Sequence, residues 1–311
     1  MVRFSIFLFL CTLAIGLLGC QDENDRGENG LSEKLNTQIE ESEENGSWHQ
    51  LFYQKINEVD SMYKKPSQKT KYWLALTQGY LTNKMPEEAE KSLLQALRWQ
   101  KDYTDIDQQI ENIAETLHIN AKRKAISKTY YKVIVDYYPS SDFVTKAKDN
   151  LPEDMSSLQN QMEDLDEIIV KRLSENNELS PILIKDYISV AQLLTIFTDN
   201  IQAYTYLNKA AALSRGYGDI NMAEVLYDWV ILENPENAIA AKSLFEKGFM
   251  LDQSGFTENA TITYNRFLQE YPDHQLASQV RILRDNVSES EEELLERLKS
   301  MKEDSDSLAT Q

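Results

Sequence analysis

The sequence predicts an all-α fold in which helical hairpins stack side by side into a solenoid. From Trp48 onward, apolar residues recur at the three- and four-residue intervals of amphipathic helices. A frame of aromatic and small residues returns along this region, and internal periodicity on this scale is typical of repeat architectures. We therefore expect one helical repeat domain over residues 47–286. Its clearest repeats lie at about 70–103, 204–237 and 241–274.

Residues 1–19 have the composition of a secretory signal peptide. Arg3 gives a positive start, and the apolar run from Phe4 to Leu18 is shorter than a membrane-spanning helix needs. The run ends in Leu17-Leu18-Gly19-Cys20, which resembles the lipobox of bacterial lipoproteins. This resemblance implies cleavage before Cys20 and diacylation of its thiol. Two buried acyl chains, at about 0.8 kcal/mol per CH2, form a stable membrane anchor. The alternative is an ordinary signal peptide that contains a cysteine.

The cysteine content agrees with this interpretation. The chain has two cysteines, Cys11 in the apolar run and Cys20 at the cleavage point. After processing, the remaining thiol would carry lipid, so neither a disulfide nor a thiolate metal site could form. An exported domain without disulfides has to be stabilised by its core.

Much of the net charge of -19 lies near the two ends of the chain. Residues 21–46 contain nine acidic residues against Arg26 and Lys34, and residues 288–311 contain eight against three basic residues. The first segment, with few large apolar residues, predicts an acidic disordered tether over residues 20–46. A nucleic-acid partner is excluded because it needs a basic stripe that the sequence lacks.

Residues 70–103 carry the repeat frame most completely. Two small positions let the paired helices approach closely, while aromatic residues fill the space beside them. The frame in this unit consists of Trp73, Leu76, Tyr80, Ala89, Leu93 and Ala96. Their spacing resembles that of the tetratricopeptide repeat, with Thr77 where that pattern prefers glycine, and it implies a right-handed superhelix.

The frame returns twice near the C-terminus. Its members are Ala223, Tyr227, Val230 and Pro235 in one unit, and Ala260, Tyr264, Phe267 and Pro272 in the next. Asp219 and Thr257 are the expected N-caps of the two second helices, and Gly248 is expected to lie where Ala260 lets two helices meet. A weaker unit surrounds Tyr131. The alternative is an irregular helical bundle with coincidental alanines.

Residues 155–200 fit the frame less well and predict a helical pair that joins the N-terminal repeats to the C-terminal ones. Ile168 and Leu173 are among the residues at apolar spacing in its first helix. Residues 273–286 are expected to form an unpaired last helix. Residues 287–311 predict a capping helix followed by an acidic disordered tail.

A lipobox, an acidic tether and repeats of this form together resemble the tetratricopeptide lipoproteins of the Bacteroidota outer membrane. Residues 241–286 are the most specific portion, and Cys20 to Asp25 resembles the acidic export signal of surface lipoproteins in that group. An acidic spacer without such a signal is the alternative. The repeat type and the anchor are also similar to BamD, the repeat lipoprotein family of the outer-membrane β-barrel assembly machine. These resemblances imply anchoring to the outer membrane, on its periplasmic or surface face, and a role in outer-membrane protein assembly.

The sequence offers little support for an enzyme. His49, His118 and His274 are far apart and lack carboxylates at ligand spacing. No glycine-rich phosphate loop and no Gly-x-Ser-x-Gly elbow is present, and Asp105 and Asp107 lack the glycine and glutamate of a calcium loop. We therefore expect no catalysis, no cofactor and no metal. Two function classes remain: a protein-interaction scaffold, and a carbohydrate-capture lipoprotein working beside an outer-membrane transporter.

The repeat frame also predicts a binding surface. In repeats of this type, the first helix of each unit lines the concave face. The residues expected to contact an envelope protein or peptide are Lys71, Gln78, Asn208, Arg215, Lys242, Phe245 and Phe249. Three cations and two aromatic residues suit an extended peptide that carries a carboxylate. The alternative is that some of them, the two phenylalanines above all, pack against adjacent repeats.

Overall fold

The computed structural model describes residues 27–44, 47–119, 123–198, 200–233 and 235–287. The expected signal peptide, the lipidation site Cys20 and the predicted C-terminal cap and tail lie outside these residues. Within them, the regular secondary structure is all helical, without strands. No helix in this part is long and apolar enough to cross a membrane.

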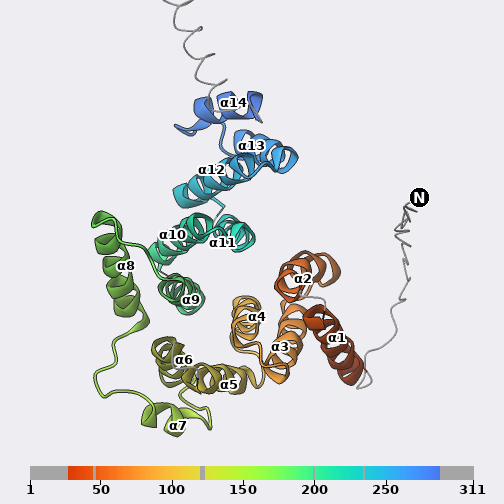
Figure 1. Cartoon of the computed structure of the whole chain (residues 1–311), viewed down its shortest axis with the longest axis vertical. Coiled ribbons are helices and arrows are strands. Elements are labelled where there is room, and N and C mark those ends of the chain that lie inside the picture. The colour runs from red at the N-terminus through yellow and green to blue at the C-terminus, as the bar shows by residue number, and fades with distance from the viewer. Residues whose placement is uncertain (1–26, 45–46, 120–122, 199, 234, 288–311) are drawn as a thin grey trace, which may run out of the picture.

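Fourteen helices follow one another through the described residues (Figure 1). In the N-terminal half they are α1 (Gly27–Glu44), α2 (Trp48–Met62), α3 (Pro66–Thr82), α4 (Pro86–Trp99), α5 (Ile106–Ile119), α6 (Lys124–Tyr137) and α7 (Val144–Asp149). In the C-terminal half they are α8 (Leu158–Ser174), α9 (Pro181–Phe197), α10 (Ile201–Tyr217), α11 (Ile220–Glu233), α12 (Ala238–Gln253), α13 (Thr257–Glu270) and α14 (Ala277–Asp285). We call these halves the N-terminal arm (α1–α7) and the C-terminal arm (α8–α14).

Consecutive helices pack as pairs, which confirms the all-α prediction and is consistent with a helical-repeat solenoid. The most extensive contacts join α3 to α4, α5 to α6, α10 to α11 and α12 to α13. The predicted small and aromatic positions are buried, including Tyr80, Ala89, Tyr227, Ala260 and Tyr264. Pro66, Pro86 and Pro181 each stand at the first residue of a helix, where the missing N–H costs no intrahelical hydrogen bond.

One of the two predicted helix caps is correct. Gly218, at a φ of 91°, ends α10 and turns the chain so that Asp219 precedes α11. The Asp219 carboxylate accepts a hydrogen bond from the Met222 backbone N–H at 3.0 Å, as an N-cap does. The expectation for Thr257 is wrong, because Phe256 is the cap residue and Thr257 is already the first residue of α13.

The expected disordered tether is wrong for residues 27–44, which form α1 and pack along α3. Leu31, Leu35 and Ile39 recur every fourth residue, so they form one stripe on the helix. Leu35 and Ile39 are fully buried, and the side chain of Ile39 lies against Gly79 of α3. The many acidic residues of this segment concealed a short apolar stripe that is sufficient to dock a helix.

The two arms meet where α9 of the C-terminal arm lies against the N-terminal arm (Figure 1). Besides its chain neighbours α8 and α10, α9 packs against α4 and α6. The predicted joining pair is therefore present as α8 and α9, although α8 packs mainly on α9. Ile168 and Leu173 of α8, expected among its apolar positions, remain about half exposed because no second helix covers them.

A buried polar network fastens α9 to the N-terminal arm. Arg123 is 2% exposed, and its guanidinium donates to Asp186 on α9 at 2.7 Å and forms an ion pair with Glu90 on α4 at 3.0 Å. The Tyr130 and Ser189 hydroxyls donate to the same Glu90 carboxylate at 3.0 and 2.8 Å. Because each buried charge has charged or hydroxyl partners, the network joins three helices without leaving an uncompensated ion.

Candidate functional site

The seven residues predicted to line a groove do not surround one cavity. Lys71 and Gln78 lie on α3 in the N-terminal arm, whereas the other five lie on α10 and α12 in the C-terminal arm. The arms approach each other through α2, α4, α9 and α11, so these first helices do not face one another across the junction. The cavities described below are lined by other residues.

Asn208 connects two neighbouring helical pairs and is not exposed to a partner. It is 3% exposed, its amide nitrogen donates to Glu246 at 3.0 Å, and its amide oxygen accepts from the Ser243 hydroxyl at 2.6 Å. Both partners belong to α12, so Asn208 holds α10 against the next helical pair. The prediction that Asn208 would contact a partner is therefore wrong.

The predicted residues of α12 remain at the surface in part. The Phe245 and Phe249 rings are stacked, with centroids 6.3 Å apart and planes 14° from parallel, and both side chains are half-buried. Lys242 is exposed and lies 3.7 Å from Glu246 on the same helix. Arg215 on α10 is half-buried, and Gln78 on α3 is exposed. Lys242, Phe245 and Phe249 thus lie at the surface of α12, and they line neither of the two cavities described below.

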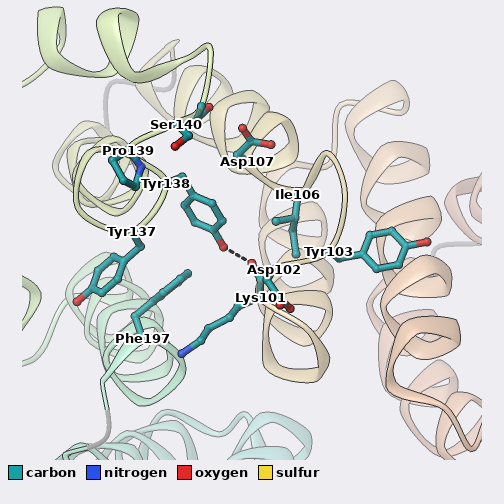
Figure 2. Close-up of a pocket in the computed structure, with 11 residues that line it drawn as sticks. Lys101, Asp102, Tyr103, Ile106, Asp107, Tyr137, Tyr138, Pro139, Ser140 and Phe197 are labelled. Carbon is teal, nitrogen blue, oxygen red and sulfur yellow. Dashed lines mark hydrogen bonds between the residues drawn. The ribbon is translucent and has the colours of Figure 1, made fainter.

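The largest cavity described here, about 490 Å³, lies where three helices end (Figure 2). α4 ends at Trp99, α6 at Tyr137 and α9 at Phe197, and the chain leaving each of the first two helices contributes to the wall. We call this cavity the C-terminal pocket, because it lies at the C-terminal ends of these three helices. Its lining residues are Lys101, Asp102, Tyr103, Ile106, Asp107, Tyr137, Tyr138, Pro139, Ser140, Ser141 and Phe197.

Aromatic rings form one side of the C-terminal pocket. The Tyr137 and Phe197 centroids are 4.6 Å apart with planes inclined by 32°, and the Tyr138 ring meets Phe197 edge-on at 6.0 Å. Tyr137 is 37% exposed, whereas Phe197 is 8% exposed, so Tyr137 presents the more accessible ring. Figure 2 shows Tyr138 and Phe197 pointing toward the connection between α4 and α5. Tyr103 belongs to this connection, and its ring points away from the pocket.

Polar groups form the opposite side. The Tyr138 hydroxyl donates to the Lys101 carbonyl at 2.5 Å, and the Lys101 ammonium donates to the Ile196 carbonyl at the end of α9 at 3.1 Å. Burial raises the pKa of the Tyr138 hydroxyl, and the nearby carboxylates of Asp107 and Asp102 raise it further. Both carboxylates thus act on the same part of the pocket, with Asp102 exposed and Asp107 half-buried.

A second cavity, of about 270 Å³, lies between the arms and is bounded mainly by α2, α4 and α11. Two tryptophan rings beside it make cation–π contacts. The Lys69 ammonium lies 3.6 Å from the Trp99 ring centroid, and the Arg98 guanidinium lies 4.6 Å from the Trp229 ring centroid. Two of its carboxylates are already neutralised within the chain. Asp60 pairs with Lys69 and Asp228 pairs with Lys247, each at 2.8 Å. This cavity therefore has less unpaired charge to offer a ligand than the C-terminal pocket.

The sequence does not predict the C-terminal pocket. Of its lining residues, only Asp107 stands out in the sequence, as part of an Asp-x-Asp pair that lacks the rest of a calcium loop. The signal lay in the ends of helices: two aromatic residues close α6, one closes α9, and acidic residues follow α4. Sequence alone does not show that these three ends meet.

Among the described residues, no group of three or more histidine, cysteine or acidic side chains is placed to hold a metal ion.

No protein-family model matches the chain, and no curated protein matches it.

Proposed function

We propose that the chain is a lipid-anchored protein of the tetratricopeptide type that serves as a non-catalytic interaction scaffold in the bacterial cell envelope, with outer-membrane protein assembly as its setting. The observation that carries this proposal is the run of consecutively paired helices. Such architectures present long surfaces for partner proteins, and their function resides in those surfaces. The lipobox-like sequence before Cys20 supports the anchor, and the stacked phenylalanines of α12 together with the C-terminal pocket are the surfaces that support partner binding.

The anchor is tested by replacing Cys20 with alanine. The Cys20→Ala chain should lose acylation and move from the membrane to the soluble fraction, because no thiol remains to carry the two acyl chains. Fractionation followed by a salt and carbonate wash measures this directly. A Cys20→Ala chain that stays in the washed membrane pellet would contradict the lipoprotein assignment.

Carbohydrate capture is the second candidate, and the aromatic rings of the C-terminal pocket are the feature that favours it. A sugar ring can lie against an exposed tyrosine while carboxylates accept its hydroxyls. The two functions predict different companions for the protein extracted from membranes: barrel-assembly subunits for the scaffold and an outer-membrane transporter for sugar capture. Calorimetric titration with neutral oligosaccharides provides an independent check, because the scaffold proposal expects no heat of binding.

A further inference from the structure

The C-terminal pocket concentrates the negative ends of three helices. The last carbonyl groups of a helix have no intrahelical partners, and the helix dipole places roughly half a negative charge at this end. Neither α6 nor α9 has a basic residue in its last turn to offset that charge. Arg98, which does occupy the last turn of α4, pairs with Glu233 at 3.0 Å.

Formal charges act in the same direction. Asp102 and Asp107 both line the pocket, and neither forms an ion pair with another described residue. Lys101 is the one cation among the lining residues, and its ammonium donates to the carbonyl of Ile196 at 3.1 Å. The pocket therefore has two carboxylates and the negative ends of three helices, against one lysine and the positive N-terminal end of α5, where Ile106 and Asp107 line the wall. The balance remains negative.

The aromatic side adds a surface that suits a planar cation. The accessible Tyr137 ring lies beside Phe197, and guanidinium groups stack on aromatic faces through cation–π and van der Waals contact. A guanidinium also binds carboxylates with two parallel hydrogen bonds, which a lysine ammonium cannot do. A volume of about 490 Å³ accommodates such a side chain and some adjoining backbone.

We propose that the C-terminal pocket binds an arginine side chain presented by a protein partner, with Tyr137 and Phe197 as the stacking surface and Asp102 and Asp107 as the charge partners. The proposal rests on the scaffold function in one respect, that the arginine belongs to a protein. Its electrostatics oppose a peptide carboxylate, the ligand that the sequence predicted for the surface of α10 and α12. They also favour a cation over the neutral sugar of the alternative function.

Short blocked peptides test this pocket without knowledge of the partner. The full chain, extracted with its lipid, is titrated calorimetrically with acetyl-Gly-Arg-Gly-amide and with the matching glutamine and glutamate peptides. The arginine peptide should bind at least about tenfold more tightly than the glutamine peptide, a difference equivalent to roughly 1.4 kcal/mol, and the glutamate peptide should not bind. Raising the salt concentration should weaken binding of the arginine peptide.

Matched variants identify the site. Asp102→Asn combined with Asp107→Asn should remove the preference for arginine, whereas Asp105→Asn should keep it, because Asp105 is in the same connection but does not line the pocket. Asp105 has a φ of 59°, a conformation that asparagine also adopts, so this control changes charge without straining the backbone. Because Asp107 lies in the first turn of α5, melting curves of both variants are compared, and Tyr137→Leu provides a second variant that leaves the carboxylates intact.

Three results would overturn the proposal: equal affinity for the arginine and glutamine peptides, an unchanged preference in the double variant, or an unchanged affinity in Tyr137→Leu. Tighter binding of free spermidine than of the arginine peptide would also overturn it, by assigning the pocket to a small amine. Co-purification of envelope proteins with the chain is a separate readout. The scaffold function can therefore stand or fall independently of the pocket.

Discussion

At Gly248, α12 approaches α13 so closely that an added Cβ atom would lie 2.7 Å from Cε1 of Tyr264 and 2.8 Å from its Cδ1. The sequence predicted a tight approach at Gly248 but assigned it to Ala260. The neighbour is the aromatic ring, which is itself fully buried and cannot move aside without disturbing the pair.

Gly248→Leu should therefore lower the free energy of unfolding by roughly 1–3 kcal/mol through overpacking. Gly216→Ala is the matched control, because Gly216 lies in α10 with no atom within 4 Å of an added Cβ, and alanine there should be neutral or stabilising. Hydrogen exchange should report lost protection between Leu244 and Tyr271 in Gly248→Leu alone. Full protection of this region would contradict the packing described for α12 and α13.

Asp186, whose side chain is 14% exposed, is the carboxylate whose titration is most informative. Burial raises its pKa to about 6 despite the opposing effect of Arg123, and the nearby charge of Glu90 raises it as well. An aspartate in an unfolded chain has a pKa of about 3.9. Between these values the folded protein binds a proton that the unfolded chain does not, so the contribution of Asp186 to stability increases as the pH falls and is lost as the pH rises through 6.

The free energy of unfolding should therefore gain about 1 kcal/mol from this residue between pH 7.5 and pH 5. Asp186→Asn does not titrate and should not show this gain. The relevant quantity is the difference in unfolding free energy between the wild type and the variant, measured with urea at both pH values, because other carboxylates cancel in it. A difference that stays constant or decreases toward pH 5 would show that Asp186 is ionised in the fold.

Among the elements, α1 is the one that sequence composition concealed and the structure revealed. The nine acidic residues among residues 21–46 give this segment an average charge that predicts disorder. Leu31, Leu35 and Ile39 nevertheless form an apolar stripe that packs into the core. The helices with complete repeat frames were predictable because each frame position is also a packing position. α8 lies between these cases, since its helical spacing is correct but the neighbour that would cover Ile168 and Leu173 is missing.

Ile39→Asp should release α1 from α3, because a carboxylate cannot be buried there without a partner. Limited trypsin digestion of the full chain should cleave after the exposed Lys34 at least about tenfold faster in this variant, since cleavage follows the population of the opened state. Glu40→Asp, at the neighbouring exposed position, should leave the rate unchanged. Equal cleavage rates in the wild type and Ile39→Asp would mean that α1 is not docked in solution.

The predicted binding residues also show that the sequence does not predict which helices their side chains contact. The repeat frame correctly placed Phe245 and Phe249 on α12, but it could not show that Asn208 would bond to Glu246 and Ser243. An amide at a supposed groove position has the same sequence signature whether it meets a ligand or the next repeat. The C-terminal pocket was beyond reach for a related reason, because it is formed by the ends of helices from both arms.

For the molecule as a whole, the long-range contacts explain why the repeats do not form an open array. Tyr53 on α2 donates to both Asp219 oxygens at 3.2 Å, and Lys185 on α9 pairs with Glu87 on α4 at 2.6 Å. These contacts hold the N-terminal arm against the second helices of the C-terminal arm (Figure 1). The faces of α10 and α12 and the C-terminal pocket remain available to partners.

The most direct test of the proposed scaffold function is to isolate the full chain from membranes and to determine which proteins are bound to it. The tagged full chain is extracted in mild detergent, purified, and examined by native mass spectrometry beside the Cys20→Ala chain. We expect a defined complex of the wild-type chain with one or more envelope proteins in fixed stoichiometry, and we expect it to be absent or depleted in the Cys20→Ala chain. A wild-type chain that is recovered from the membrane alone, at the mass of its lipidated form, would contradict the proposed scaffold function.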